Sequence, residues 1–493
     1  IQHMELAADA EGKVTAVRAN LTADMGAYMQ LVTPGIPLLG AFLYHGVYDV
    51  PAYHFECTGV FTNRTPTDAY RGAGRPEATY ALERAMDALA RAVGVDGPEI
   101  RRRNYIAPDK FPYVSIAGLT YDSGNYEPTL DRALELIGYD ERRAEQQRRR
   151  DAGDTKHLGI GVTTYVEMCG LAPSRVLASL KYAAGGWEAA TVRVLPTGKV
   201  QVVSGTTPHG QGHETSWSQI VADRLGVDPD DIEVLHSDTA ISPQGMDTYG
   251  SRSLPVGGVA VAMAADQVIT KARAIAAHQL ECAEDDLEML DGELRVRGTP
   301  TKAMTLQAVA FEAFSAHDLP DGVEPNLTAE VTYDPPNFVF PFGTHVAVVE
   351  IDEETGGVEL LDYAAVDDCG VQVNPMIVEG QLHGGIVQGV AQALWEEAVY
   401  DDDGNLRNPS LIDYCVPSAA EVPTFKLDHT VTPSPTNLLG VKGIGEAGTI
   451  GSTPTIINAV IDALAPLGIT DMAMPAHPER VWAAIRDARA VSS

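Results

Sequence analysis

Glu446 lies in a loop whose composition would bring it close to a bound ligand. The segment from Gly440 to Pro454 places one carboxylate and one lysine among five glycines. Glycine lets the backbone approach a ligand closely, so the carboxylate could touch a substrate or a cofactor. Ser452 or Thr453 is expected to cap the following helix, with Pro454 at its first position. Taken alone, the same loop is more typical of a glutamate exposed to water.

Three further loops share this design, because each is polar or rich in glycine and each precedes a predicted helix. They comprise residues 69–77, 210–215 and 248–253. A helix N-terminus presents unpaired N–H groups and a positive dipole end, and glycine lets these groups reach an anion. Four such loops therefore predict a large anionic cofactor held from several sides. The P-loop sequence is absent, which argues against ATP.

The elements that position these loops are strands and helices that do not strictly alternate, which predicts an α+β fold. Apolar spacing predicts helices over residues 76–94 and 256–280, a strand over 158–165 and a hairpin over 191–203. A polar stretch near residues 151–157 is typical of a linker. It predicts two domains, residues 1–150 and residues 151–493.

Charge and cysteine usage exclude several classes of protein. The 35 basic and 68 acidic residues give a net charge of −33, which argues against a nucleic-acid partner. No apolar run is expected to cross a membrane. The five cysteines are odd in number and form no C-x-x-C pair, so neither a disulfide framework nor an iron–sulfur cluster is expected on this chain. A reducing, cytoplasmic compartment is the expected location.

Six segments, in their order along the chain, resemble the molybdenum-binding large subunit of the xanthine dehydrogenase/aldehyde oxidase/carbon monoxide dehydrogenase family. The resemblance covers essentially the whole chain and is strongest to the form II large subunits. The segments are residues 69–77, 210–215, 249–253, 367–375, 379–385 and 442–446. Large subunits of this family extend further at the N-terminus, and this chain begins within a predicted strand. It is therefore expected to be their C-terminal part, and a separate N-terminal half is one partner to consider.

The resemblance implies two mixed α/β molybdopterin-binding domains with the cofactor at their interface. Glu446 matches the family's general base, which activates an oxygen bound to molybdenum while hydride passes to the metal centre. Arg71 matches an arginine that faces the substrate and stabilises developing negative charge, although a buried structural ion pair is the alternative. The implied activity is oxidation of a small molecule, an aldehyde or an N-heterocycle.

The resemblance also implies the cofactor and its contacts. The cofactor would be molybdenum with molybdopterin cytosine dinucleotide, and no side chain would ligate the metal. Separate iron–sulfur and FAD subunits would carry the electrons away. A structural role is equally open for Cys369, Asn374, Gln381 and Lys442. The expected cofactor-binding residues are Gly72, Ala73, Gly74, Gly210, Gln211, Gly212, His213, Thr215, Thr248, Tyr249, Ser251, Ser253, Cys369, Asn374, Gln381, Lys442 and Gly443.

One position departs from the carbon monoxide dehydrogenases of the family. Those enzymes carry a copper-binding cysteine directly after the arginine, where this chain has Gly72. A copper site would lack its thiolate anchor, so carbon monoxide oxidation is the alternative rather than the leading prediction. A second alternative is a non-catalytic, cofactor-binding fragment that needs a separate N-terminal partner.

Overall fold

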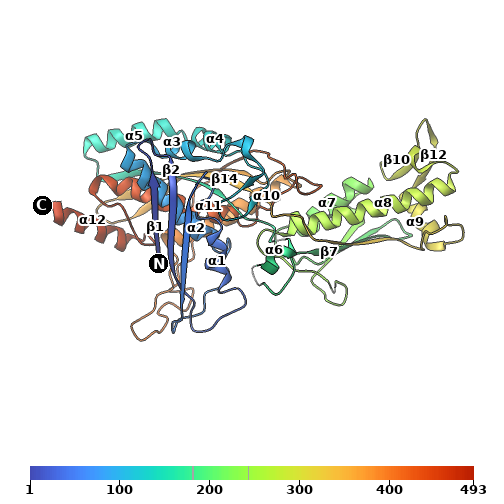
Figure 1. Cartoon of the computed structure of the whole chain (residues 1–493), viewed down its shortest axis with the longest axis horizontal. Helices are drawn as coiled ribbons and strands as arrows, with labels where there is room; N and C mark the ends of the chain where they lie inside the picture. Colours follow the sequence, from blue (N-terminus) through green and yellow to red (C-terminus); the bar gives the residue numbers. More distant parts are fainter. Residues whose placement is uncertain (172, 180–181, 243, 493) are drawn as a thin grey trace.

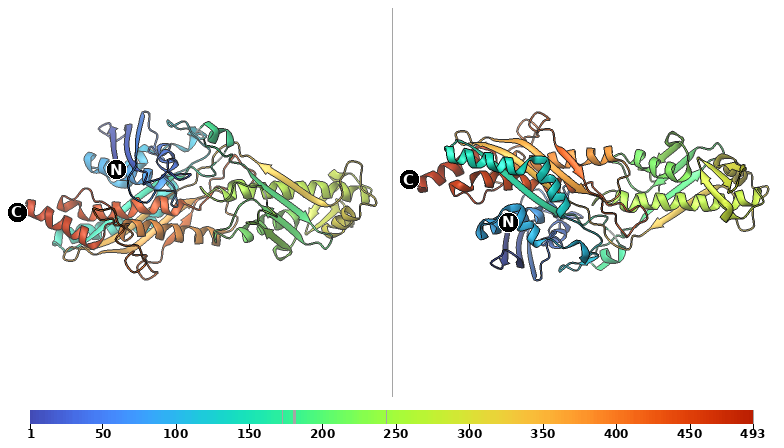
Figure 2. Two further views of the ribbon diagram at one scale, coloured as in Figure 1. Left: turned by 90° about the horizontal axis from the view of Figure 1, so that it is seen from below. Right: turned by 90° about the horizontal axis from the view of Figure 1, so that it is seen from above.

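Two lobes lie end to end along the long axis of the protein, and both termini belong to the larger lobe (Figure 1). The computed structural model describes residues 1–171, 173–179, 182–242 and 244–492. The larger lobe is built from the segments before residue 171 and after residue 335. The smaller lobe is built from the segments between them. The same division is visible in both rotated views (Figure 2).

A four-stranded sheet with the order β16-β15-β14-β6 forms the centre of the larger lobe. Strand β14 is antiparallel to both of its neighbours, while β16 runs parallel to β15. Successive side chains of β14 point to opposite faces, and both sets are buried: Val346 and Val348 on one face, Ala347 and Val349 on the other. The strands are β6 (Lys156–Val166), β14 (Phe342–Asp352), β15 (Val358–Asp368) and β16 (Lys426–His429).

Helices cover both faces of this sheet. On one face α10 (Pro375–Leu394) packs against α11 (Ala447–Leu464), and on the other lie α4 (Glu127–Ile137) and α5 (Tyr139–Ala152). Helix α2 (Arg75–Val93) packs on α11 and on a separate three-stranded sheet near the N-terminus. That sheet and the remaining elements of the lobe are β1 (Gln2–Ala8), β2 (Val14–Asp24), β3 (Tyr53–Val60), α1 (Gly35–Ala41), α3 (Gly97–Asn104), β4 (Tyr113–Val114), β5 (Thr120–Tyr121) and α12 (Pro478–Ser492).

The smaller lobe is a second sheet, with the order β13-β7-β8-β9, packed against helices. Residues from alternate positions of its strands share one apolar core with α7, α8 and α9. A small three-stranded sheet stands at the tip of the lobe (Figure 1). The elements are α6 (Ser174–Ser179), β7 (Glu188–Val194), β8 (Val200–Ser204), α7 (His213–Leu225), β9 (Ile232–Leu235), α8 (Val259–Gln279), β10 (Leu287–Leu290), β11 (Glu293–Val296), β12 (Thr299–Thr305), α9 (Leu306–Ser315) and β13 (Leu327–Tyr333).

The α+β prediction is confirmed, and most of the predicted elements are present. The predicted first helix is α2, which ends at Gly94 in the left-handed conformation. The predicted hairpin is β7 and β8, and the long apolar helix is α8, preceded by a π-helical turn over Ser253–Gly258. The predicted boundary after residue 150 falls within the last turn of α5, a helix that contacts β6. The predicted boundary separates residues 1–150 from residues 151–493, whereas the larger lobe contains elements from both ranges. The boundary stays a prediction.

The predicted start of the helix after Glu446 is wrong. Helix α11 begins at Ala447, directly after Glu446, and contains Pro454 in its interior. The glycines that indicated a loop are helical because they make close contacts. A Cβ at Gly448 would lie 2.8 Å from the backbone nitrogen of Ile386 on α10, and one at Gly451 would lie 2.6 Å from the ring of His345. Tertiary packing here overrides the low helix propensity of glycine.

Two helical stretches are long and apolar enough to cross a membrane by length and composition alone, contrary to expectation. They are Ser253–Gln279 and Ala447–Leu467. In their most apolar windows, 67% and 78% of the residues are buried inside the protein. Core helices of this kind satisfy the same criterion, so the finding is weak evidence for a membrane span, and the absence of a span stays a prediction.

Candidate active and cofactor site

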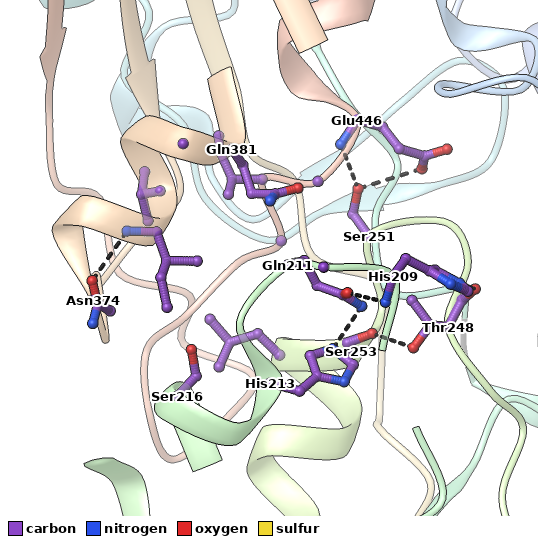
Figure 3. A pocket seen from close by; sticks show the side chains of 18 of the residues that line it. His209, Gln211, His213, Ser216, Thr248, Ser251, Ser253, Asn374, Gln381 and Glu446 are labelled. Atoms are coloured by element: carbon purple, nitrogen blue, oxygen red, sulfur yellow. Dashed lines mark hydrogen bonds between the residues drawn. The ribbon is translucent and has the colours of Figure 1, made fainter. Parts of the chain in front are cut away.

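A cavity of about 460 Å³ lies where the two lobes meet. The loops before α7 and α8 contribute one wall, and the loop before α11 and helix α10 contribute the other (Figure 3). Arg71, from the loop before α2, also lines the cavity. The four loops that the sequence singled out therefore converge. The predicted residues that line the cavity are Arg71, Gly210, Gln211, His213, Thr248, Tyr249, Ser251, Ser253, Asn374, Gln381, Gly443 and Glu446.

Glu446 is held by groups from two separate segments, the loop that leads into α2 and the loop that contains Ser251. Its Oε1 accepts a hydrogen bond of 2.8 Å from the N–H of Gly72, and its Oε2 forms an ion pair with Arg75. Ser251 donates its hydroxyl to Oε2 at 3.4 Å and accepts the backbone N–H of Glu446 at 3.1 Å. The side chain remains 14% exposed. These contacts fix the carboxyl group of Glu446 at the cavity wall.

Arg71 is anchored by amide oxygens rather than by a carboxylate. Its guanidinium donates to the carbonyl of Gly445, to the side chain of Gln388 at 3.0 Å and to that of Gln381 at 2.9 Å. The two glutamines are seven residues apart on α10 and therefore lie on the same face of the helix. Within the described part of the chain, no carboxylate oxygen lies within 4.0 Å of the Arg71 nitrogens. Burial lowers the pKa of Arg71, while Glu446 acts in the opposite direction.

The loop before α7 forms a short hydrogen-bonded chain (Figure 3). Gln211 donates from Nε2 to Nε2 of His213 at 2.9 Å, and Nδ1 of His213 lies 3.4 Å from the hydroxyl of Thr206. The ring of His213 stacks on Trp217 with centroids 4.8 Å apart. Burial lowers the pKa of His213 to about 4, so the ring is neutral at pH 7. His213 is thus a hydrogen-bonding member of the loop.

The cavity retains polar groups and open space that suit a ligand. Trp217 and Tyr249 are side chains with polar donors that line the cavity, and the buried Nε1 of Trp217 has no hydrogen-bond partner among the described residues. Buried donors of this kind are normally satisfied. A Cβ at Gly210 or at Gly380 would meet nothing within 4 Å, so these two backbones leave room for a bound group. The donors and the open glycines fit a large polar or anionic cofactor.

The other predicted site residues lie outside the cavity. Gly72 reaches the site only through its N–H, and Gly74 caps α2 with its α-carbon facing α1. Lys442 is buried with its ammonium 4.9 Å from the ring centre of Phe342, and burial lowers its pKa. The remaining residues are Ala73 beside Gly72, Gly212 packed near Ile377, Thr215 exposed on α7, and buried Cys369, whose carbonyl accepts the N–H of Lys442.

Several residues at the site escaped the sequence analysis. Arg75 lies in the same motif as Arg71, four residues later, and this repetition of arginine was the one available signal. Glu167 follows the apolar strand β6 and gave no signal, although it is fully buried beside Arg75. His209, Ser216, Trp217 and Gln388 also line the cavity. No group of three or more His, Cys, Asp or Glu side chains suited to a metal occurs within the described ranges.

Two protein-family models match the chain, and both are described as a molybdopterin cofactor-binding domain. One matches residues 132–423 and the other matches residues 1–105. The larger match covers more than half of the chain and contributes most of the cavity. The predicted pair of molybdopterin-binding domains is therefore confirmed.

Individual relatives agree with these matches. The chain is 42% identical over 487 residues to the carbon monoxide dehydrogenase large chain of Hydrogenophaga pseudoflava, covering 98% of this chain and 60% of the relative. It is 36% identical over 486 residues to the nicotine 6-hydroxylase large subunit of Paenarthrobacter nicotinovorans, covering 97% and 58%. Quinoline 2-oxidoreductase from Pseudomonas putida 86 superposes with a TM-score of 0.92 at 38% identity, covering 99% and 62%.

The chain thus spans about 60% of the length of these relatives. Within that span the domain matches, the sequence identity and the superposition all point to one group of proteins. The chain belongs to the molybdenum-binding large-subunit domains of the xanthine dehydrogenase/carbon monoxide dehydrogenase family.

Proposed function

We propose that the protein forms the catalytic part of a molybdenum hydroxylase that oxidises an aldehyde or an N-heterocycle. The observation that carries this proposal is the carboxylate of Glu446, held at the cavity wall by Gly72, Arg75 and Ser251. Relatives named for nicotine and quinoline oxidation support the substrate class. The bound molybdenum cofactor, in its cytosine dinucleotide form, would supply the two-electron redox chemistry.

Glu446 is the proposed general base. Oε2 accepts hydrogen bonds from Arg75 and Ser251, whereas Oε1 accepts one N–H from the described residues, that of Gly72, which leaves it a free lone pair. We therefore assign Oε1 as the atom that takes a proton from the oxygen nucleophile. A positioned base of this kind typically contributes a factor of about 10² to 10⁴ to the rate.

Arg71 is the proposed electrostatic stabiliser of the substrate. Gln381 and Gln388 hold its guanidinium at the cavity wall without neutralising its charge. A fixed positive charge in a partly dry site stabilises negative charge that develops on a carbonyl oxygen or a ring nitrogen. The absence of an ion pair among the described residues favours this role over a structural one.

The cofactor would be held from both lobes. Gly210, Gln211, Trp217 and Tyr249 would face it from the smaller lobe, and Gly380 and Gly443 from the larger one. Thr248 and Ser253 share a hydrogen bond of 2.9 Å at the start of the π-helical turn that precedes α8, and they would present their hydroxyls to its anionic groups. The ammonium of Lys442 lies behind the loop, so we propose that this residue supports the wall instead.

Partners and location belong to the same proposal. Electrons would leave through separate iron–sulfur and FAD subunits, because the five cysteines of this chain are free and scattered. Free cysteines also suit a reducing, cytoplasmic compartment. A separately encoded N-terminal half stays a prediction.

The direct test combines cofactor analysis with a substrate screen on the intact complex. We expect stoichiometric molybdenum and cytosine-containing pterin, and dye reduction with an aldehyde or an N-heterocycle. A folded preparation without molybdenum and pterin would refute the proposal. Bound cofactor without turnover of either class would instead favour the non-catalytic alternative.

Carbon monoxide oxidation is the second candidate, because one relative at 42% identity is named a carbon monoxide dehydrogenase large chain. Against it, Gly72 follows Arg71, and Cys169 lies buried behind the loop, where it donates to the carbonyl of Ser251 at 3.1 Å. Copper analysis together with dye reduction under carbon monoxide separates the two candidates. Stoichiometric copper with carbon monoxide-dependent reduction would establish the second.

Gly380→Ala is expected to separate cofactor binding from folding. The new Cβ meets no protein atom within 4 Å but projects from a residue that lines the cavity. Alanine inside helix α10 should raise the free energy of unfolding of the cofactor-free protein by about 0.5–1 kcal/mol. Pterin content per chain should fall at least severalfold. Gly35→Ala, with equally open space in α1 away from the cavity, is the control and should leave pterin content unchanged.

Undiminished pterin content in Gly380→Ala would show that the cofactor does not approach α10.

A further inference from the structure

A second carboxyl group lies buried behind Glu446. Glu167 directly follows strand β6, and its side chain is 0% exposed. Its nearest cationic group is Arg75, whose Nη1 lies 3.9 Å from Oε1 of Glu167. Arg75 therefore stands between two carboxyl groups, Glu446 on the cavity side and Glu167 on the interior side.

The hydrogen bonds of Arg75 are committed to other acceptors. Nε donates to the carbonyl of Gly72, Nη1 donates to the carbonyl of Met168 at 2.6 Å, and Nη2 donates to Glu446. Neither oxygen of Glu167 has a hydrogen-bond partner among the described residues. One cation thus faces two carboxyl groups but bonds to only one of them.

An ionised carboxylate in this position would be costly. A buried charge without hydrogen bonds carries a large desolvation penalty, and the usual response is neutralisation by a proton. The other groups around Glu167 compensate too little: Ser251 acts to lower the pKa of Glu167, but burial outweighs it, and Glu446 repels a second negative charge. Arg71 also interacts electrostatically with Glu167, but its guanidinium is anchored on α10.

We propose that Glu167 carries a proton while Glu446 is ionised, so that the site holds one proton between two carboxyl groups and Arg75 remains fully paired with Glu446. Glu167 is then a positioning residue. When it is neutral, Arg75 pairs with Glu446 alone, and this pairing stabilises the ionised form of Glu446, which is the form that can act as a base. The role in turnover rests on the proposed function, whereas the protonation of Glu167 does not.

The electrostatics of the pair agree with this assignment. Burial raises the pKa of Glu167 to about 8, with Glu446 adding to the rise and Arg75 opposing it. At Glu167 the folded state therefore holds a proton that the unfolded chain releases, over the range from about pH 4.5 to pH 8. The stability that this proton contributes is therefore greatest below about pH 4.5 and is lost as the pH rises towards 8.

Infrared difference spectroscopy on the purified protein, without substrate, tests the proposal. The wild type should show the C=O stretching band of a protonated carboxylic acid at pH 6, and the band should disappear as the pH rises through about 8. Glu167→Gln should lack the band, because the amide mimics the neutral acid without titrating. Glu141→Gln on the exposed face of α5 is the control and should keep it.

Melting temperatures provide a second measurement, which distinguishes the proposed protonation from a folding defect in Glu167→Gln. The melting temperature of Glu167→Gln minus that of the wild type should become more positive from pH 5 to pH 8. Only the wild type loses the stability linked to the proton on Glu167 over this range. A wild type without a titrating band, or a band that persists in Glu167→Gln, would overturn the proposal. A titrating band in a protein that turns over no substrate would leave it standing and would refute the proposed function instead.

Discussion

Replacing Glu446 with glutamine is expected to lower kcat by about 10²- to 10⁴-fold while molybdenum and pterin remain bound. The amide cannot take a proton from the nucleophile, and it removes the ion pair with Arg75. The cavity walls that would hold the cofactor come mainly from other residues. Steady-state kinetics with a substrate found in the screen, together with metal and pterin analysis of the same preparation, measures both effects.

Glu379→Gln is the matched control for this experiment. Glu379 lies on α10 near the cavity but is exposed, and its contact is with His383 at 3.7 Å. This variant should turn over like the wild type. If Glu446→Gln retained turnover within tenfold of the wild type, Glu446 would not be the base. If it lost the cofactor instead, the residue would serve binding.

Arg101→Met is expected to lower the free energy of unfolding by about 3–5 kcal/mol, the usual cost of leaving one partner of a buried ion pair uncompensated. Arg101 is fully buried and binds Glu83 and Asp87 of α2, each at 2.8 Å, and the carbonyl of Val162 on β6 at 2.7 Å. It therefore joins α3, α2 and the central sheet. Methionine fills much of the volume but leaves the buried carboxyl group of Glu83 without its cation.

Arg103→Met on the same helix provides the comparison. Its ion pair with Glu99 is partly exposed and is worth about 1 kcal/mol or less. Denaturant unfolding of both variants beside the wild type measures the difference. Equal losses in the two variants would mean that the Arg101 cluster contributes no more than a surface pair.

The convergence of the four loops was predictable from sequence, because helix N-termini and glycines have local chemical signatures. Gly210, Ser251 and Glu446 all line the predicted cavity for this reason. The start of α11 was not predictable in the same way. Gly448 and Gly451 indicate a loop by propensity, and their helical state depends on α10 and His345, which are distant in sequence.

The buried residues that pack behind the site were not predictable from the sequence either. Glu167 stands at the end of an apolar strand, and only the packing of three segments around it shows that it is buried beside Arg75. Lys442 and Glu446 are close in sequence, yet one points into the interior and the other to the cavity. A side chain's direction within a glycine-rich loop depends on backbone angles that composition does not specify.

The insertion of the smaller lobe between β6 and β14 has a consequence for synthesis on the ribosome. These two strands pair from Val166 with Phe342 to Lys156 with Asp352. Strand β6 therefore cannot pair with β14 until the whole smaller lobe has been translated. Pairing between such distant segments is slow, whereas units with local contacts fold as they emerge. We expect the smaller lobe to fold first, on the nascent chain. The cavity can then form only after the last strands and α11 have been released, which makes cofactor loading a late, post-translational step.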